Sequence, residues 1–331
     1  MVVVMNAQHG ARNRQQPQAG DSFALLATVQ AMTQRLTPTA ALLLVIPPLM
    51  WSGNAVVGRM VAPLISPMTL NLLRWAIAFL ILLPLASRVL RANSGLWPQW
   101  KRFALLSLFS IGGYNALLYL ALNTSTAINV TLVGASTPVW MLLIGRLLFK
   151  APVSRKQLLG AVLSIGGVLL VLGRGDWQVI THLRLVPGDL YVLLASIGWA
   201  AYSWLLAHPT PESEEIRSDW STFLMGQIVF GLGWSLAFTS GEWLLTPAHI
   251  DWSLGLAAAL AFIALGPAVI AYGTWGAGVS RAGPAVAGFF INLTPLFTAV
   301  LSSIFLGEAP KLYHALAFVL IVSGIVLSSR K

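Results

Sequence analysis

Long apolar segments separated by short polar connections run through most of the chain. Each segment has about 20 residues, enough for an α-helix to cross about 30 Å of hydrocarbon. The tightest connections, 123–126 and 307–311, leave no room for a soluble domain. We therefore expect an all-α integral membrane protein with ten transmembrane helices. These are expected near Thr39–Gly58, Met68–Leu90, Phe103–Leu122, Ala127–Phe149, Gln157–Gly173, Asp189–Ala207, Thr222–Ser240, Leu254–Trp275, Pro284–Leu306 and Leu312–Ser329.

Composition supports a membrane environment. Hydrophobic residues make up 57% of the chain and charged residues 9%, whereas soluble domains carry about 25% charged residues. The formal net charge of +10 does not indicate nucleic-acid binding, because the basic residues form short clusters between apolar runs. The chain has no cysteine, which excludes disulfides, thiolate nucleophiles and cysteine-ligated metals.

The distribution of lysine and arginine predicts orientation, because cytoplasmic loops of membrane proteins are enriched in both. With a cytoplasmic N-terminus, fifteen basic residues fall on the inner side and four on the outer side, while Arg74 lies within a helix. We expect a multi-pass protein of the cytoplasmic (inner) membrane with both termini in the cytoplasm. The lipid bilayer is then its main partner, no nucleic acid is expected, and a homo-oligomer is possible.

Residues 1–36 are polar and rich in Gln and Arg, and they lack helical periodicity. They predict a disordered cytoplasmic tail and do not fit a signal peptide. The pattern leaves Met1, Met5 and Met32 open as the start of translation.

The two halves of the chain are related in sequence. Thr137-Pro138 matches Thr294-Pro295 at an offset of 157 residues, and Gly167 matches Gly324 at the same offset. The offset spans five helices, an odd number, so the second repeat begins on the other side of the membrane and is inverted. Inverted repeats are a common architecture of carriers that work by alternating access.

Polar and aromatic residues within the spans are the candidates for a substrate site. Aromatic walls with a few amides suit a small zwitterion that has an apolar side chain, although ordinary packing explains many such residues. The candidate cavity residues are Trp51, Asn54, Arg74, Asn115, Tyr119, Trp140, Trp199, Tyr202, Tyr272 and Asn292. Prolines within spans predict kinks, which serve either packing or a cavity lining, at Pro48, Pro138, Pro267 and Pro295.

Arg74 is the one basic residue placed inside a span. It either binds an anionic substrate group or serves structure by snorkelling or by bracing carbonyls. No carboxylate is expected at mid-membrane, so proton coupling would have to use a group such as Glu308 or His314 near the outer face, each of which also fits a structural role. Proton coupling and facilitated diffusion both stay open, and no metal site is predicted. The five histidines lie in loops or at helix ends, which makes an intramembrane enzyme a distant alternative. We predict no catalytic residues and no cofactor.

Several motifs resemble the drug/metabolite transporter superfamily in its EamA-type branch. Trp51-Ser52-Gly53-Asn54 and Leu73-Arg74-Trp75 look like signatures of its first two helices. Gly188-Asp189-Leu190 resembles the opening of its second repeat, and the run from Thr294-Pro295 to Leu306-Gly307-Glu308 resembles the repeat ending. The first repeat departs from the pattern, because Phe149-Lys150-Ala151-Pro152 stands where Leu-Gly-Glu is common.

The resemblance implies two repeats, expected over 37–174 and 187–329, and a carrier that is often an exporter of amino acids or related metabolites. We therefore expect a transporter of small metabolites, with export of neutral amino acids by alternating access as the first hypothesis. Uptake of a sugar or nucleoside-type solute is the alternative within transport. A scaffold or sensor role is not excluded by the sequence.

Overall fold

The computed structural model describes residues 36–330 except 126, 183–185, 211–213 and 307–310, and for a few helical residues it describes the main chain alone. The expected disordered tail lies, apart from Leu36, outside the described residues, as do Met32 and Glu308. The described chain is helical throughout, apart from turns, loops and one isolated β-bridge between Ile65 and Ile250.

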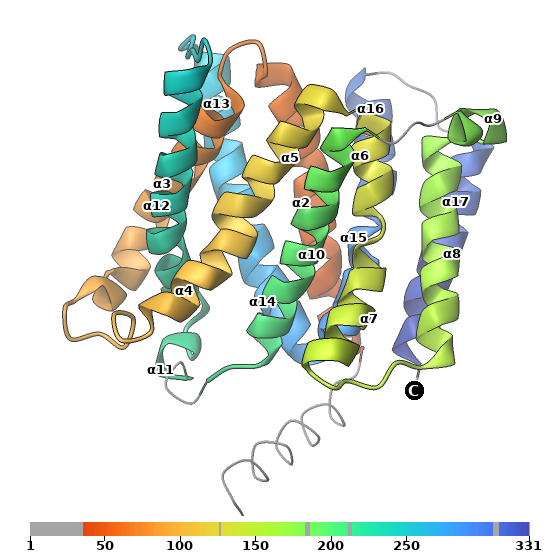
Figure 1. The fold of residues 1–331 in the computed structure, drawn as a ribbon, viewed down its shortest axis with the longest axis horizontal. Coiled ribbons are helices and arrows are strands. Elements are labelled where there is room, and N and C mark those ends of the chain that lie inside the picture. The colour runs from red at the N-terminus through yellow and green to blue at the C-terminus, as the bar shows by residue number, and fades with distance from the viewer. Residues whose placement is uncertain (1–35, 126, 183–185, 211–213, 307–310, 331) are drawn as a thin grey trace, which may run out of the picture. The chain divides into compact units, whose positions relative to one another are not determined.

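Helices of the first half follow the expected order (Figure 1). They are α2 (Pro38–Val61), α3 (Pro67–Ala86) with the 3₁₀ turn η1 (Ser87–Leu90), α4 (Trp100–Ser107), the π-helix η2 (Leu108–Gly112), α5 (Gly113–Thr124), α6 (Ala127–Gly134), α7 (Thr137–Leu148), α8 (Arg155–Leu172) and the short α9 (Trp177–Thr181). The third span is thus α4, η2 and α5 in succession, and the fourth is α6 followed by α7.

The second half repeats this order. It contains α10 (Pro187–Ala207), the short α11 (Glu214–Arg217), α12 (Trp220–Leu245), α13 (Leu254–Ile263), the π-helix η4 (Ala264–Ile270), α14 (Ala271–Ala282), α15 (Pro284–Ile291), α16 (Thr294–Leu306) and α17 (Leu312–Ser329). The eighth span is therefore interrupted by a π-helix, as the third is, and the ninth is broken into two helices, as the fourth is.

Eight stretches of helix in the described chain are long and apolar enough to cross a membrane. The two remaining spans are the third, which carries Lys101 and Arg102 near its start, and the fourth, of which Thr137–Leu148 counts as a shorter apolar helix. Both of these spans are helical, but each is interrupted, and the third also carries charged residues. The expected all-α architecture of ten spans is confirmed.

The interruptions fall at equivalent places in the two halves. Residues 135–136 separate α6 from α7, and residues 292–293 separate α15 from α16, which reproduces the offset of 157. Both breaks precede the matched prolines Pro138 and Pro295, which stand in the first turns of α7 and α16. Proline is favoured there because a first-turn residue needs no intrahelical N–H donor.

The contacts between helices show the same symmetry between the two halves. The first helix of each half packs against the third of the other, as α2 with α14 and α10 with α5. It also packs against the fourth of the other, as α2 with α16 and α10 with α7. Equivalent spans of the two halves also contact each other directly, through α3–α12, α7–α15 and α8–α17, and Figure 1 shows α8 and α17 side by side at one edge of the helices. This pattern confirms two inverted five-helix repeats.

The alternation of the spans gives the bundle two ends. The end at which α2 begins and α17 finishes carries most of the basic residues, and we call it the basic face. Its described members are Arg88, Arg91, Lys101, Arg102, Arg146, Lys150, Arg155, Lys156, Arg217, Arg281 and Arg330. The opposite face carries Arg59, Arg174 and Lys311.

Candidate transport site

Seven aromatic rings from five spans form one contact cluster inside the bundle, which we call the aromatic cluster. Its members are Trp51, Trp75, Tyr114, Trp199, Tyr202, Tyr272 and Trp275. Trp199 is central, since its ring centroid lies 5.1 Å from Trp51, 5.4 Å from Tyr114 and 5.6 Å from Tyr272. Trp75 joins through Tyr272, at 4.9 Å in an edge-to-face arrangement. The rings pack directly against one another, so aromatic side chains fill the space between these five spans.

The cluster bridges the two halves through an equivalent pair of tryptophans. Trp51 lies 13 residues after the proline that begins α2, and Trp199 lies 12 residues after the proline that begins α10. Because α2 and α10 are the first helices of inverted repeats, these positions meet near the middle of the bundle. Their edge-to-face contact therefore lies where the two halves meet, which is the expected location of a carrier's site.

The π-helices supply hydrogen-bond acceptors to this pair. A π-helix widens the turn and is common at functional sites. The indole Nε1 of Trp51 donates to the carbonyl of Pro267 in η4 at 3.3 Å. The equivalent carbonyl of the first half is Ser110 in η2, since 267 − 110 = 157, but it accepts instead from the hydroxyl of Tyr272 at 3.3 Å. The indole N–H of Trp199 is buried without an acceptor among the described residues.

This asymmetry predicts different effects of one substitution at two equivalent sites. Trp51→Phe leaves the Pro267 carbonyl without its donor, whereas Trp199→Phe removes a donor that has no acceptor. Both changes remove similar volume, and the hydrogen bond that is lost only in Trp51→Phe is worth about 1 kcal/mol. We expect a lower thermal unfolding midpoint in detergent for Trp51→Phe than for Trp199→Phe. Equal midpoints would show that the Trp51 bond adds nothing.

Two asparagines, Asn71 on α3 and Asn115 in the first turn of α5, bond one carbonyl of the π-helix η2. The carbonyl of Ile111 accepts from Nδ2 of Asn71 at 3.3 Å and from Nδ2 of Asn115 at 3.2 Å. Asn71 also donates to the hydroxyl of Ser235 on α12, at 3.1 Å. Asn115 therefore supports the helix that carries the site by bonding a carbonyl one turn earlier in the same span.

Arg74 lies two turns into α3, next to the aromatic cluster. Its side chain is 3% exposed, and its guanidinium carbon stands 5.0 Å from the centre of the Trp75 ring. It is also close enough to Tyr272 for its charge to act on the phenol. Within the described part of the chain no side chain or carbonyl accepts a hydrogen bond from Arg74, and its Nε is fully buried.

The break in the ninth span is held by bonds to other helices. Asn292 donates from Nδ2 to the hydroxyl of Ser164 at 2.9 Å and to the carbonyl of Ala135 at 3.4 Å, which joins it to the break in the fourth span. Ser52 donates to the carbonyl of Thr294 at 2.9 Å. In the fourth span, Thr137 instead satisfies the Gly134 carbonyl that Pro138 frees, at 2.6 Å. The two breaks are equivalent in position but held differently.

The sequence candidates thus divide into groups. Trp51, Trp199, Tyr202 and Tyr272 meet in the aromatic cluster, and Arg74 lies beside it. Trp140 makes no ring contact with the cluster in the described structure and donates to Ser136 at 3.0 Å. Asn54 lies near Trp51 on α2, half-buried, and Asn292 lies at the helix break. The Tyr119 side chain is outside the described residues. Pro48, Pro138 and Pro267 are buried, and Pro295 is partly buried.

Three cluster members were not among the sequence candidates. Trp275 lies three residues after Tyr272, just as Tyr202 lies three residues after Trp199, and residues three apart share a helix face. That spacing could have identified Trp275. Trp75 directly follows Arg74, and Tyr114 directly precedes Asn115, so neither could be placed on the inner face without the helix orientation.

Two loops on the opposite face pair directly with each other. The loop after α2 and the loop before α13 form the β-bridge, with Ser66 N donating to the His249 carbonyl at 3.0 Å and Asp251 N donating to the Leu64 carbonyl at 2.7 Å. Glu242 of α12 caps the N-terminus of α3. Its carboxylate accepts from the backbone N–H groups of Met68 and Thr69, both at 2.9 Å, and from the Thr69 hydroxyl at 2.8 Å.

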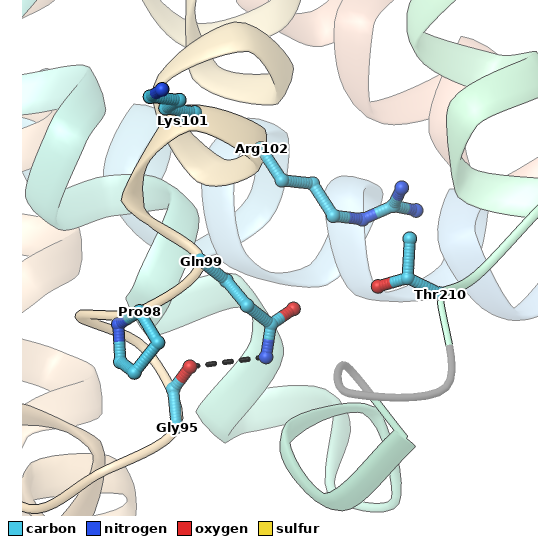
Figure 2. A pocket seen from close by; sticks show the side chains of 6 residues that line it. All are labelled: Gly95, Pro98, Gln99, Lys101, Arg102 and Thr210. Atoms are coloured by element: carbon cyan, nitrogen blue, oxygen red, sulfur yellow. Dashed lines mark hydrogen bonds between the residues drawn. The ribbon is translucent and has the colours of Figure 1, made fainter.

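Equivalent loops on the basic face border a hollow of about 440 Å³ (Figure 2). It is lined by Gly95, Pro98, Gln99, Lys101, Arg102 and Thr210. Figure 2 shows Arg102 extending from α4 towards the segment that carries Thr210. Arg102 donates to the carbonyls of Leu205 and His208 at 2.8 and 2.9 Å, so a cation caps the C-terminus of α10.

His208 ends α10 beside this hollow. Burial lowers the pKa of its imidazole below the usual value, and the nearby charge of Arg102 lowers it further, although a hydrogen bond to the Trp204 carbonyl acts in the other direction. The imidazole is therefore neutral at pH 7, and the positive charge of the hollow comes from Lys101 and Arg102. Among the described residues, no group of three His, Cys, Asp or Glu side chains could hold a metal ion.

Comparison with known proteins agrees with this architecture. The EamA-like transporter family matches the chain twice, over residues 38–173 and 186–330. "Uncharacterized transporter YyaM" of Bacillus subtilis strain 168 is 26% identical over 230 residues, which covers 69% of this chain and 72% of that protein. An "Uncharacterized transporter" of Archaeoglobus fulgidus is 24% identical over 292 residues, covering 88% of this chain and 97% of its own.

A solved crystal structure shares the fold, with a TM-score of 0.70 at 20% sequence identity over 88% of this chain and 96% of the other. The curated relatives are named as transporters, and the family is one of transporters and not of enzymes. The two family matches together cover most of the chain and follow the two halves of the observed inverted repeat. The protein belongs to the EamA-like transporter family.

Proposed function

We propose that this transporter exports neutral amino acids or related small metabolites from the cytoplasm by alternating access. The observation that carries the proposal is the contact between Trp51 and Trp199, which places an aromatic cluster where the two inverted halves meet. Aromatic walls bind the apolar part of a small solute while a few polar groups orient it. The substrate would occupy this position after a small separation of the rings.

The difference between the two faces supports the alternating part of the proposal. Paired loops and the Glu242 cap close the opposite face, while equivalent loops border a hollow on the basic face. In a protein built from inverted repeats, each half can adopt the arrangement of the other. The opposite face would then open while the basic face closes. The basic face is proposed to be cytoplasmic, since lysine and arginine accumulate there, so the hollow would admit substrate from the cytoplasm.

Counterflow in proteoliposomes tests this proposal. Purified protein is reconstituted into vesicles loaded with unlabelled solute, and entry of labelled neutral amino acids, sugars and nucleosides is followed with and without a pH gradient. Accumulation of labelled amino acids is expected, together with its loss in Trp51→Ala and Trp199→Ala variants that remain folded. Selective accumulation of a sugar or nucleoside would replace the proposed substrate class, and uptake by whole cells would reverse the proposed direction.

A further inference from the structure

Arg74 combines a buried charge with the absence of a counter-ion. The side chain is 97% buried, since 3% of it is exposed, and no described residue forms a hydrogen bond or ion pair with it. The contact with the face of Trp75 at 5.0 Å is its one favourable charged interaction among the described residues. A cation–π contact of this kind offsets only part of the cost of removing a guanidinium from water.

Structural roles for Arg74 find no support in its surroundings. A snorkelling arginine would expose its guanidinium at a face of the bundle, and this one is buried. An arginine that braces a helix break would donate to a carbonyl, as Arg102 does at the end of α10, and Arg74 donates to none that is described.

No carboxylate within the described chain is placed to neutralise Arg74. The described acidic side chains lie at helix ends or in loops. Glu242 lies on α12, which packs against the helix of Arg74. Both of its carboxylate oxygens, however, accept hydrogen bonds from the first turn of α3. The positive charge beside the aromatic cluster is therefore uncompensated by the described protein.

Unpaired donors gather in the same region. The indole N–H groups of Trp75 and Trp199 are buried without acceptors, as is the Nε of Arg74. All three residues flank Tyr272, which contacts the rings of Trp75 and Trp199 at 4.9 and 5.6 Å. Buried donors are nearly always satisfied in proteins, so donors without acceptors at a candidate site indicate a ligand that accepts hydrogen bonds.

We propose that Arg74 is the anion anchor of the transport site and that the substrate presents one carboxylate group together with an apolar body. This inference rests on the proposed function and narrows it. One guanidinium balances one negative charge and matches the two oxygens of a carboxylate, whereas a dianionic phosphate would leave a net charge inside the bundle. Since no buried carboxylate faces the site in the described chain, no described group would pair with an ammonium on the substrate. The amine-free acid is therefore expected to bind at least as well as the amino acid.

A series of charge-altered ligands tests the recognition directly. Purified protein in detergent is heated with leucine, with 4-methylpentanoate (no amine), with 3-methylbutylamine (no carboxylate) and with leucinamide (a neutral carboxamide), and the same four forms of phenylalanine are used. Ligands that bind the folded state raise the unfolding midpoint. We expect the amino acid and the amine-free acid to raise it, and the amine and the amide to have no effect.

Arg74→Met provides the second measurement. Loss of a charge-assisted bidentate contact should weaken carboxylate binding by about 10- to 100-fold. In the absence of ligand, Arg74→Met should unfold at a higher temperature than the wild type, because an unpaired buried charge is removed while the apolar stem is kept. A structurally required arginine would give the opposite sign. Arg146→Met, at an exposed position of the basic face, is the matched control and should change neither quantity.

The outcomes separate the two proposals. Stabilisation by amines and not by acids would overturn the role of Arg74 but leave a transporter of small metabolites intact. A lower unfolding temperature for ligand-free Arg74→Met would also overturn the anchor. If none of the eight ligands binds and none is carried in counterflow, the proposed substrate class fails, while a higher midpoint for Arg74→Met would still support an anion site.

Discussion

Valine at Gly167 is expected to disrupt the pairing of α8 with α17, whereas valine at the adjacent Gly166 should leave the protein folded and active. A Cβ atom at Gly167 would lie 2.7 Å from Cγ1 of Ile321 and 2.9 Å from the carbonyl oxygen of Ala317. The second contact is with a backbone atom, which cannot move away by a change of side-chain rotamer. A Cβ atom at Gly166 would have no heavy atom within 4 Å.

The size of the effect follows from how closely the two helices approach. Gly160 and Gly324 also face each other, since a Cβ on either would lie within 2.7 Å of the other's carbonyl oxygen. In a bilayer, close backbone approach at small residues is a main source of helix association. Overpacking of a close contact costs about 1–3 kcal/mol, and we expect Gly167→Val to reach the upper end of that range.

Thermal unfolding and size-exclusion chromatography in detergent check this prediction with the two single variants side by side. Gly167→Val should lower the unfolding midpoint by several degrees or prevent recovery of monodisperse protein, while Gly166→Val should match the wild type. A midpoint for Gly167→Val equal to that of Gly166→Val would show that the two helices can separate without loss of stability. Both substitutions change helix propensity equally, so propensity does not explain a difference between them.

The fold could be predicted largely from the sequence because lipid imposes simple requirements. Every backbone polar group in hydrocarbon needs a partner, so an apolar stretch of 20 residues becomes a helix. The matched pairs Thr137-Pro138 and Thr294-Pro295 predicted the equivalence of the halves, and the structure places a helix break before each pair. Pro138 and Pro295 predicted a kink in each of these spans. The sequence did not show that each helix ends and a new one begins, since an apolar run has the same composition on both sides of a break.

The aromatic cluster was predictable in part. Trp199 with Tyr202 and Tyr272 with Trp275 have the i, i+3 spacing of one helix face, but whether that face points to lipid or to the other half depends on tertiary packing. The unpaired state of Arg74 and of the Trp199 indole could not be predicted at all. Both depend on which polar groups the tertiary packing brings beside each side chain.

Glu242 shows a further limit of sequence reasoning, because its role is to cap a helix other than its own. Ser66 precedes α3 in the N-cap position but makes no side-chain capping bond. Glu242 supplies the missing acceptors from α12, and Trp243 adds a bond from its indole to the Thr69 hydroxyl at 2.8 Å. A local search for capping residues around α3 would not find a carboxylate that lies more than 170 residues away.

Removing this carboxylate is expected to favour opening of the opposite face. In Glu242→Ala, the first-turn N–H groups of α3 lose a charged acceptor, which should cost the closed arrangement about 1–2 kcal/mol. If the cap breaks when that face opens, the open population rises by a factor of roughly 5–30. Glu242→Gln keeps one carbonyl acceptor and should give an intermediate effect.

The chain lacks cysteine, so a single introduced thiol reports on access without a background. Asn54→Cys lies one turn beyond Trp51 on α2, towards the opposite face. A membrane-impermeant maleimide added at that face should label it faster when Glu242→Ala is also present. Asp251→Ala removes a charge from the same face without removing the cap, and serves as the control. An unchanged labelling rate in folded Glu242→Ala protein would mean that the cap stabilises α3 without controlling access to the aromatic cluster.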